Sequence, residues 1–298
     1  MKRMVALIPL TFFCMAFAGV AGAQAADAAR AAVLTSVRYR VVPNVTYHIA
    51  AGYEAKLDLY LPRGQEIHPT LIQIHGGGWV GGSKEGSSLR FLPYLEMGWA
   101  VVNVEYRLGP DSLAPAAVED CLCALRWIIR NAEQYNIDTD RLVVTGYSAG
   151  GHLALTTGII PPSAGLDRQC PGNEALEVAA IINWFGITDV GDLLDGENMK
   201  SYAVTWMGSM LDRYNVAERV SPLTHVRPGL PPILTIHGDA DPTVPYSHAV
   251  RLHEALDEAG VQNRLHTVPG GGHGNFSLPE FQEAYEVILG FLKEHGLR

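Results

Sequence analysis

The sequence predicts an α/β fold in which a mostly parallel central sheet of about eight strands carries helices on both faces. Short apolar runs alternate with longer segments of helical periodicity over most of the chain, and strands separated by helices favour parallel pairing. Glycine-rich segments follow several of these runs, at residues 76–78, 146–151 and 270–274. Ligands bind at the carboxyl ends of the strands in such sheets, so we expect the functional residues there.

The first expected element is a hairpin over residues 45–62, with Gly52 at its turn and alternating apolar residues before Pro62. Further strands are expected at 70–74, 100–106, 142–145, 178–185, 232–236 and 264–268. These runs are short and apolar, as is typical of strands buried on both faces.

A long amphipathic helix is expected to begin at Pro115, because proline is tolerated in the first helical turn. Its residues Val118, Leu122 and Leu125 recur at helical spacing. Other helices are expected at 87–97, 149–158, 247–259 and 279–295.

Residues 187–222 interrupt this alternation and hold several large side chains, among them Tyr202, Trp206 and Met207. Two interpretations remain open. The side chains are either ordinary core, or part of a small cap insertion that forms one wall of a substrate pocket.

Residues 1–25 are predicted to be a secretory signal peptide. Lys2 and Arg3 precede an apolar stretch, and small residues end at Ala25. The stretch contains Pro9 and falls short of the roughly 20 residues that span a bilayer, which disfavours a membrane anchor. We therefore expect a secreted or periplasmic protein in which residues 26–298 form a single domain, without membrane association after signal cleavage.

The formal net charge of −9 and the lack of a basic cluster argue against nucleic acid as a partner. Past residue 25 the cysteines are Cys121, Cys123 and Cys170. The first two stand two apart on an expected helix and should not pair with each other. Either one of them bonds Cys170, or all three are buried free thiols. No metal-ligand spacing is present, so we expect neither a metal nor another cofactor.

The segment Gly-Tyr-Ser-Ala-Gly-Gly at 146–151 follows an apolar run and matches G-x-S-x-G, the nucleophile-elbow signature. Its glycines allow a strand and a helix to pack closely around a strained Ser148. A neutral serine hydroxyl is a weak nucleophile and needs a base. Our candidate is His273, which lies in the glycine-rich loop 270–274.

The third catalytic residue should be a carboxylate that orients the imidazole. Asp239 and Asp241 both lie in the expected loop after His237. We favour Asp241, because Pro242 stiffens its part of the loop, and expect Asp239 to be a turn residue that bonds its own backbone. His237 is expected to be a structural donor. The resulting chain order of serine, acid and histidine is the order of the α/β-hydrolase elbow motif.

An oxyanion hole is expected from the backbone N–H of Ala149 and from the glycine run after His75, at Gly77 and Gly78. Glycine suits this role because the backbone itself must approach the substrate. We also expect three aromatic residues to contact the substrate, namely Trp79, Tyr147 and Trp206.

These segments together resemble α/β-hydrolases of the esterase/lipase superfamily, nearest the bacterial feruloyl-esterase-like and carboxylesterase branch. The matching segments are 57–62, 75–79, 106–108, 148–154, 237–245 and 272–274. The resemblance implies an α/β-hydrolase fold, Ser148, Asp241 and His273 as a triad, and the glycine run as the oxyanion loop. It also implies structural roles for Tyr106, Arg107 and Asp120. Residues 26–44 depart from the pattern, being too short for the N-terminal helical cap of hormone-sensitive-lipase relatives.

The expected function is hydrolysis of carboxylic esters through an acyl-serine intermediate, on short-chain or small aromatic acyl groups. Feruloyl and acetyl-xylan esters fall in this class, so the substrate is a small-molecule or polysaccharide-linked ester. The alternatives are an aryl-formamidase or a peptidase-type amide hydrolase of the same fold, and a non-catalytic binding module. The last would be expected to have lost a triad residue, and none is missing.

Overall fold

The computed structural model describes residues 29–30, 32–109 and 111–298, so the predicted signal peptide at 1–25 lies outside the described residues. Eight strands form one sheet in the order β1-β2-β4-β3-β5-β6-β7-β8. The pairs β1–β2 and β2–β4 are antiparallel, and all other neighbours are parallel. The predicted α/β-hydrolase fold, with a mostly parallel sheet of about eight strands, is confirmed.

The strands lie where the apolar runs predict them, although several are longer. They are β1 (Tyr39–Ala50), β2 (Tyr53–Pro62), β3 (His68–Ile74), β4 (Ala100–Val104), β5 (Ile137–Tyr147), β6 (Ala180–Trp184), β7 (Ile233–Gly238) and β8 (Asn263–Val268).

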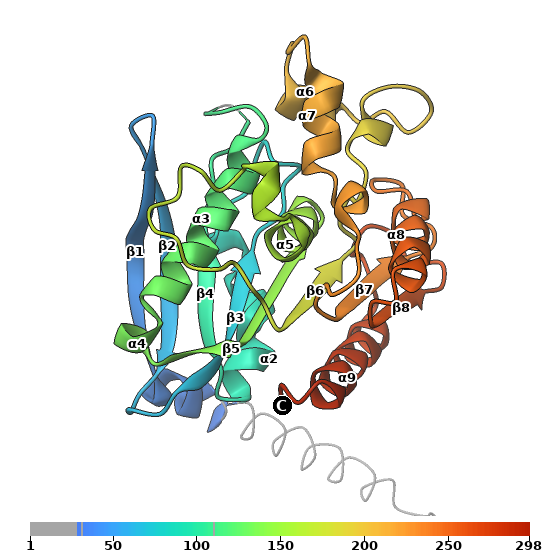
Figure 1. The fold of residues 1–298 in the computed structure, drawn as a ribbon. Coiled ribbons are helices and arrows are strands. Elements are labelled where there is room, and N and C mark those ends of the chain that lie inside the picture. The colour runs from blue at the N-terminus through green and yellow to red at the C-terminus, as the bar shows by residue number, and fades with distance from the viewer. Residues whose placement is uncertain (1–28, 31, 110) are drawn as a thin grey trace, which may run out of the picture.

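Helices cover both faces of the sheet (Figure 1). The α-helices are α2 (Leu92–Glu96), α3 (Ala116–Arg130), α4 (Ala132–Tyr135), α5 (Ala149–Ile159), α6 (Ser201–Met207), α7 (Arg213–Val220), α8 (Ser247–Glu258) and α9 (Leu278–Glu294). Short 3-10 helices are η1 (Glu85–Phe91), η2 (Pro162–Ala164), η3 (Gly191–Leu193) and η4 (Pro222–His225).

Two apolar cores lie on opposite faces of the sheet. The core under α3, α5 and α8 includes Val144, and the core under α2 and α9 includes its neighbour Val143. Successive side chains of a strand point to opposite faces, so most residues of the central strands are apolar because both faces of these strands are buried.

The helix expected over residues 87–97 is divided into η1 and α2. Pro93 stands in the first turn of α2, and its ring nitrogen has no hydrogen to donate to a continuing helix. The break places η1 alongside the glycine run that follows β3, where it contributes residues to the cavity described below.

Helices α6 and α7 form the part of residues 187–222 that projects beyond the sheet (Figure 1). The helical residues 32–38 lie at the opposite end of the molecule, next to α2. The projecting segment is therefore the one positioned near the carboxyl ends of the parallel strands.

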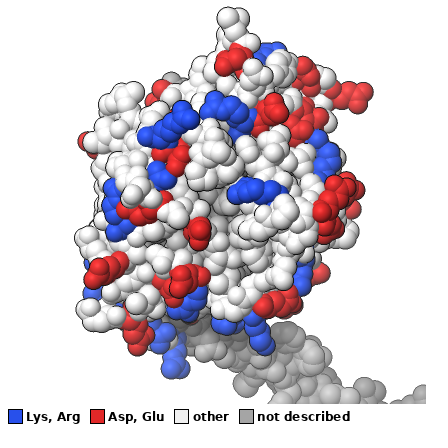
Figure 2. All heavy atoms as spheres, in the orientation of Figure 1, with Lys and Arg blue, Asp and Glu red and all other residues white. Residues whose placement is uncertain are grey.

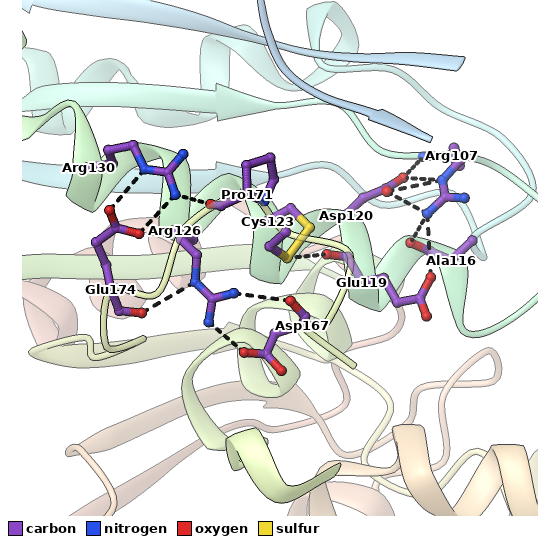
Figure 3. Close-up of a disulfide and its surroundings, with 11 residues drawn as sticks. Arg107, Ala116, Glu119, Asp120, Cys123, Arg126, Arg130, Asp167, Pro171 and Glu174 are labelled. Carbon is purple, nitrogen blue, oxygen red and sulfur yellow. Dashed lines mark hydrogen bonds and ion pairs between the residues drawn. A yellow bond between two sulfur atoms is a disulfide. The ribbon is translucent and has the colours of Figure 1, made fainter. Parts of the chain in front are cut away.

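A disulfide joins Cys123 of α3 to Cys170 in the loop before β6, and Cys121 is a buried free thiol. This pairing decides between the two alternatives that the sequence left open. Arginines one and two turns along α3 bind the same loop, because Arg126 pairs with Asp167 and Arg130 pairs with Glu174 at 2.9 Å (Figure 3).

Acidic and basic side chains are interspersed on the face shown in Figure 2, and neither sign forms a continuous patch there. Within the described ranges, the helices are all too short or too polar to cross a bilayer.

Candidate active site

Ser148 occupies the sharp turn between β5 and α5, with φ 58° and ψ −121°. This left-handed conformation is strained for a residue with a side chain. The flanking glycines make the turn possible, since a Cβ at Gly146 would lie 2.2 Å from the Gly150 carbonyl oxygen. A Cβ at Gly150 would lie 2.3 Å from the Ile74 carbonyl oxygen. The helix thus packs directly against the ends of β3 and β5, with the serine at the tip.

Ser148, His273 and Asp241 form a continuous hydrogen-bonded chain. The Ser148 Oγ lies 2.8 Å from His273 Nε2, and His273 Nδ1 lies 2.7 Å from Asp241 Oδ2. An ionised carboxylate can only accept, so Nδ1 carries the proton and Nε2 accepts from the serine hydroxyl. This is the tautomer that a general base for Ser148 requires. The structure therefore brings together the three residues that the sequence predicts as a triad.

The Asp241 carboxylate is buried and fully hydrogen-bonded. Its Oδ1 accepts the backbone N–H groups of Thr243 and Val244, at 2.7 and 3.0 Å. The N–H at His237 Nε2 is shared between two acceptors. The nitrogen lies 3.3 Å from Asp241 Oδ2 and 3.1 Å from the Val244 carbonyl oxygen. Burial alone would raise the pKa of Asp241, but the hydrogen bonds from His237, His273 and Val244 outweigh it and hold the pKa well below its usual value. The acid therefore remains ionised when the imidazole takes a proton.

Asp239 has a different role from the one expected. Its Oδ1 accepts the backbone N–H of Gly270 at 2.6 Å, so it does not bond its own turn. The backbone N–H groups of Asp239 and Ala240 also donate to the carbonyl oxygens of Val268 and Gly271. Asp239 thus ties the loop of the acid to the loop of the histidine.

The expected oxyanion donors lie around the serine. Gly77 and Gly78 line the same cavity as Ser148, and Ala149 begins α5 directly after it. Among the described residues, the backbone N–H groups of Gly77, Gly78 and Ala149 have no hydrogen-bond acceptor. Gly77 has φ 122°, and a Cβ there would lie 2.0 Å from the Gly81 carbonyl oxygen. The loop closes only with glycine, and it leaves unengaged donors beside the nucleophile.

Two of the three expected substrate contacts are corrected by the structure. Trp79 and Trp206 are completely buried and do not line the cavity. Their rings stack with centroids 4.2 Å apart, and Trp79 Nε1 donates to His152 Nδ1 at 3.1 Å. Trp79 has a left-handed backbone, φ 62°, and its indole points into the core behind the glycine run. Both tryptophans therefore pack behind the glycine run, whereas Tyr147 does line the cavity.

His75 and Tyr106 hold the start of the glycine run. The His75 Nε2 lies 2.6 Å from Glu105, and its Nδ1 lies 2.8 Å from the Gly76 carbonyl oxygen. Tyr106 stacks on the His75 ring and donates to the His75 carbonyl oxygen at 3.0 Å. The loop geometry is thus built into the ends of β3 and β4.

Arg107 and Asp120 form a buried ion pair, with Arg107 Nη2 2.7 Å and Nε 2.9 Å from the two carboxylate oxygens (Figure 3). Asp120 also accepts the Arg107 backbone N–H at 2.8 Å. The pair joins the segment after β4 to α3, which agrees with the structural role implied by the resemblance.

Ser148 lines a cavity of about 480 Å³. Besides the glycine run, Tyr147 and His273, its lining includes Tyr202 from α6, Arg90 from η1, Phe185 and Thr243. Tyr202 donates to the Thr243 carbonyl oxygen at 3.1 Å. One residue of the 187–222 segment therefore forms a wall of the cavity, while Trp206 and Met207 are core.

Sequence reasoning missed Arg90, Phe185 and Thr243. Phe185 packs edge-on against the His273 ring, with centroids 4.7 Å apart. Its place at the carboxyl end of the strand predicted over residues 178–185 is a signal that would have found it. No comparable sequence signal marks Arg90.

The described residues contain no group of three or more His, Cys, Asp or Glu side chains arranged to hold a metal ion. The chemistry that the arrangement supports is attack by an activated serine on an electrophilic carbon, with backbone donors for the resulting oxyanion.

Relatives of this chain include esterases. Esterase LipQ of Mycobacterium tuberculosis is 29% identical over 240 residues, which cover 76% of this chain and 55% of the relative. Ethyl acetate hydrolase of Pseudomonas putida is 28% identical over 266 residues, covering 82% of this chain and 80% of the relative. The chain spans about half the length of the mycobacterial relatives that it matches.

Solved structures of esterases have the same fold. A truncated carbohydrate esterase from gut microbiota has 28% sequence identity and a TM-score of 0.74, over 88% of this chain and 98% of that chain. The propionate-bound esterase Est2 of Thermogutta terrifontis has 27% sequence identity and a TM-score of 0.72, over 87% of this chain and 95% of that chain. A family model described as BD-FAE matches residues 57–256, well over half of the chain. The chain belongs to the BD-FAE family and has the α/β-hydrolase fold.

Proposed function

We propose that this protein is a carboxylic ester hydrolase that uses Ser148 as its nucleophile. The observation that carries the proposal is the hydrogen-bonded chain from Ser148 through His273 to Asp241, at the floor of a cavity with free backbone donors. The BD-FAE family membership and the esterases among its relatives support the same reaction.

In the proposed mechanism, His273 Nε2 takes the hydroxyl proton of Ser148 as Oγ attacks the ester carbonyl carbon. The negative charge on the carbonyl oxygen is stabilised by the N–H groups of Gly77, Gly78 and Ala149. His273 then gives the proton to the leaving alcohol, and an acyl-serine remains. Water, activated by the same imidazole, hydrolyses this ester and restores the serine. No step requires a metal or other cofactor.

The proposed substrates are esters with short-chain or small aromatic acyl groups. A cavity of about 480 Å³ suits a ligand of that size. Among the relatives, one is named an ethyl acetate hydrolase, and Est2 was solved with propionate and with butyrate bound. These names support small acyl groups for this chain.

The proposed location is secreted or periplasmic. The predicted signal peptide motivates the proposal, and the disulfide between Cys123 and Cys170 supports it, because disulfides persist in oxidising compartments. A fusion of residues 1–40 to alkaline phosphatase tests it, since that reporter is active only after export. An inactive fusion in a host with an intact export pathway would contradict the proposed location.

Replacement of Ser148 by alanine tests the proposed nucleophile. Turnover of p-nitrophenyl acetate should fall by a factor on the order of 10⁶, because nucleophile and base act as one unit, while the circular dichroism spectrum should remain unchanged. Paraoxon should label wild-type protein at Ser148, as one relative was solved phosphorylated by paraoxon. The labelled peptide should be absent from the Ser148→Ala digest.

Two results would contradict the proposal. One is labelling at another serine with activity retained in Ser148→Ala. The other is faster turnover of anilides and aryl formamides than of the corresponding esters, which would favour an amide hydrolase.

A further inference from the structure

The cavity wall contains one formally charged side chain, the guanidinium of Arg90. No Asp or Glu lines the cavity within the described part of the chain. The carboxylates close behind the wall are engaged elsewhere, because Glu105 pairs with His75 and Asp241 pairs with His273 and His237. The cavity therefore presents a positive charge, although the protein as a whole has a formal net charge of −9.

The Arg90 guanidinium is exposed and is held by a ring rather than by a counter-ion. Its Cζ lies 4.1 Å from the centroid of the Tyr147 ring, and no described carboxylate lies within ion-pair distance of it. A cation over a tyrosine face is attracted by the ring, but all five N–H donors of the guanidinium remain available.

The segment that carries Arg90 is anchored on both sides. Tyr285 of α9 donates to the Arg90 carbonyl oxygen at 3.0 Å, and Tyr147 stacks in turn on Trp184, with centroids 5.1 Å apart. At the start of η1, the buried Lys84 pairs with Asp58 at 2.9 Å. A guanidinium on a fixed backbone and against a fixed ring loses less freedom when it binds a ligand.

Tyr147 is the residue before the nucleophile, so the guanidinium that stacks on it lies in the same cavity as Ser148. A planar guanidinium matches a carboxylate through two parallel hydrogen bonds. We propose that Arg90 selects ester substrates that carry a carboxylate, which it binds while Ser148 attacks the ester carbonyl. This inference rests on the proposed function and names the substrate class of that site.

The carboxylate can belong to the acyl part or to the alcohol part of the ester, and two pairs of probes distinguish these sources. The acyl pair is monomethyl succinate and its neutral analogue methyl succinamate. The alcohol pair is 4-acetoxybenzoate and its neutral analogue 4-acetoxybenzamide. Each pair differs only by the exchange of a carboxylate for an amide of the same shape, so a ratio of kcat/KM within a pair reports on charge.

The variants are Arg90→Gln, Arg90→Lys and Arg90→Glu, compared with wild type by kcat/KM at low ionic strength. For the pair whose carboxylate reaches Arg90, the wild type should prefer the acid over the amide by about tenfold, the scale of a partly exposed charge-assisted contact. Arg90→Gln should abolish the preference because it lowers kcat/KM for the acid much more than for the amide. Arg90→Lys should retain part of it, and Arg90→Glu should reverse it. Added salt should weaken the preference of the wild type.

Failure of this inference is separable from failure of the proposed function. If wild type hydrolyses all four probes and neither pair shows a preference that depends on Arg90, the inference is overturned and the esterase proposal stands. A parallel loss of acid and amide turnover in Arg90→Gln also overturns it, because that result indicates a purely structural contact with Tyr147. Lack of turnover of all four probes and of p-nitrophenyl acetate overturns both.

Discussion

The carboxylate of Asp239 accepts a hydrogen bond from the backbone N–H of Gly270 at 2.6 Å. Two residues along the chain, Asp241 accepts from His273 Nδ1 at 2.7 Å. The first aspartate thus holds the backbone of the histidine loop, and the second holds the imidazole itself. One short loop after β7 positions His273 in two separate ways.

Because the two aspartates contact different parts of the histidine loop, we predict different effects for their replacement by asparagine. Asp241→Asn should lower kcat by about 10⁴, because an amide at this position no longer enforces the required histidine tautomer. Asp239→Asn should lower kcat much less and mainly reduce stability, because it weakens a hydrogen bond to the Gly270 backbone. Steady-state kinetics and urea unfolding of both variants provide the measurement. The reverse pattern would assign the catalytic acid to Asp239.

The length of the acyl chain should limit turnover. Each buried methylene contributes about 0.8 kcal/mol, so kcat/KM rises with chain length only while the cavity has room. For p-nitrophenyl esters we expect a maximum at about two to four carbons and a decline beyond it. A rise that continues to about twelve carbons, with activation at an oil–water interface, would indicate a lipase instead.

Tyr202 offers a matched test of this size limit. The side chain of Tyr202 packs against the glycine run, since a Cβ added at Gly78 would lie 2.9 Å from the Cβ of Tyr202. Tyr202 also lines the cavity. Tyr202→Ala should move the optimum to longer acyl chains, because it removes that wall. Tyr202→Phe removes only the hydrogen bond to Thr243 and should leave the optimum in place. An unchanged optimum in Tyr202→Ala would show that another part of the cavity sets the limit.

The disulfide should stabilise the fold. It closes a loop between residues that are 47 apart in sequence. A cross-link of this span reduces the entropy of the unfolded chain, which corresponds to a stabilisation of the fold by about 4 kcal/mol. The double variant Cys123→Ala, Cys170→Ala should lower the free energy of unfolding by about 2–4 kcal/mol. Dithiothreitol should destabilise wild type but not the double variant, as measured by urea unfolding. Equal effects of dithiothreitol on both proteins would contradict the bond.

Stability should fall on acidification below about pH 6.5. Burial lowers the pKa of His152 from 6.5 to about 3 and that of His248 to about 4. Trp79 can only donate, so His152 Nδ1 accepts, and His152 Nε2 donates to the Val220 carbonyl oxygen at 2.7 Å. Acceptance at Nδ1 requires a neutral imidazole, because both ring nitrogens of a protonated imidazole carry hydrogen. Since the unfolded chain takes up the proton first, the stabilisation is present above pH 6.5 and is lost as pH falls towards the folded values.

Urea unfolding at a series of pH values checks this dependence. The free energy of unfolding should decrease by several kcal/mol between about pH 6.5 and pH 4. His152→Gln should be less stable at neutral pH but should lose stability less steeply on acidification, because it lacks one of the titrating groups. A slope identical to wild type would exclude His152 as a source.

The sequence by itself determined the architecture and the chemistry-bearing positions. Runs such as 142–144 are apolar at every residue because both faces of the strand are buried, so the sequence pattern alone indicates the parallel sheet. The turn at Ser148 needs glycine at 146 and 150, since the packing distances leave no space for a Cβ. Backbone requirements of this kind restrict residue type locally. The motifs therefore pointed to Ser148 and His273, whose side chains lie 2.8 Å apart in the structure.

Only the tertiary structure decided which side chains face the cavity. Trp79 and Trp206 carry the aromatic character of a binding site, yet their rings stack on each other in the core. Arg90, with no sequence signal, stands over Tyr147 in the cavity because η1 packs against α9 and the end of β5. The choice of Cys123 over Cys121 as the partner of Cys170 was likewise settled by the orientation of α3. The physical reason is common to all three: a side chain's surroundings come from elements distant in sequence, and residue type constrains its own backbone more closely than it constrains those neighbours.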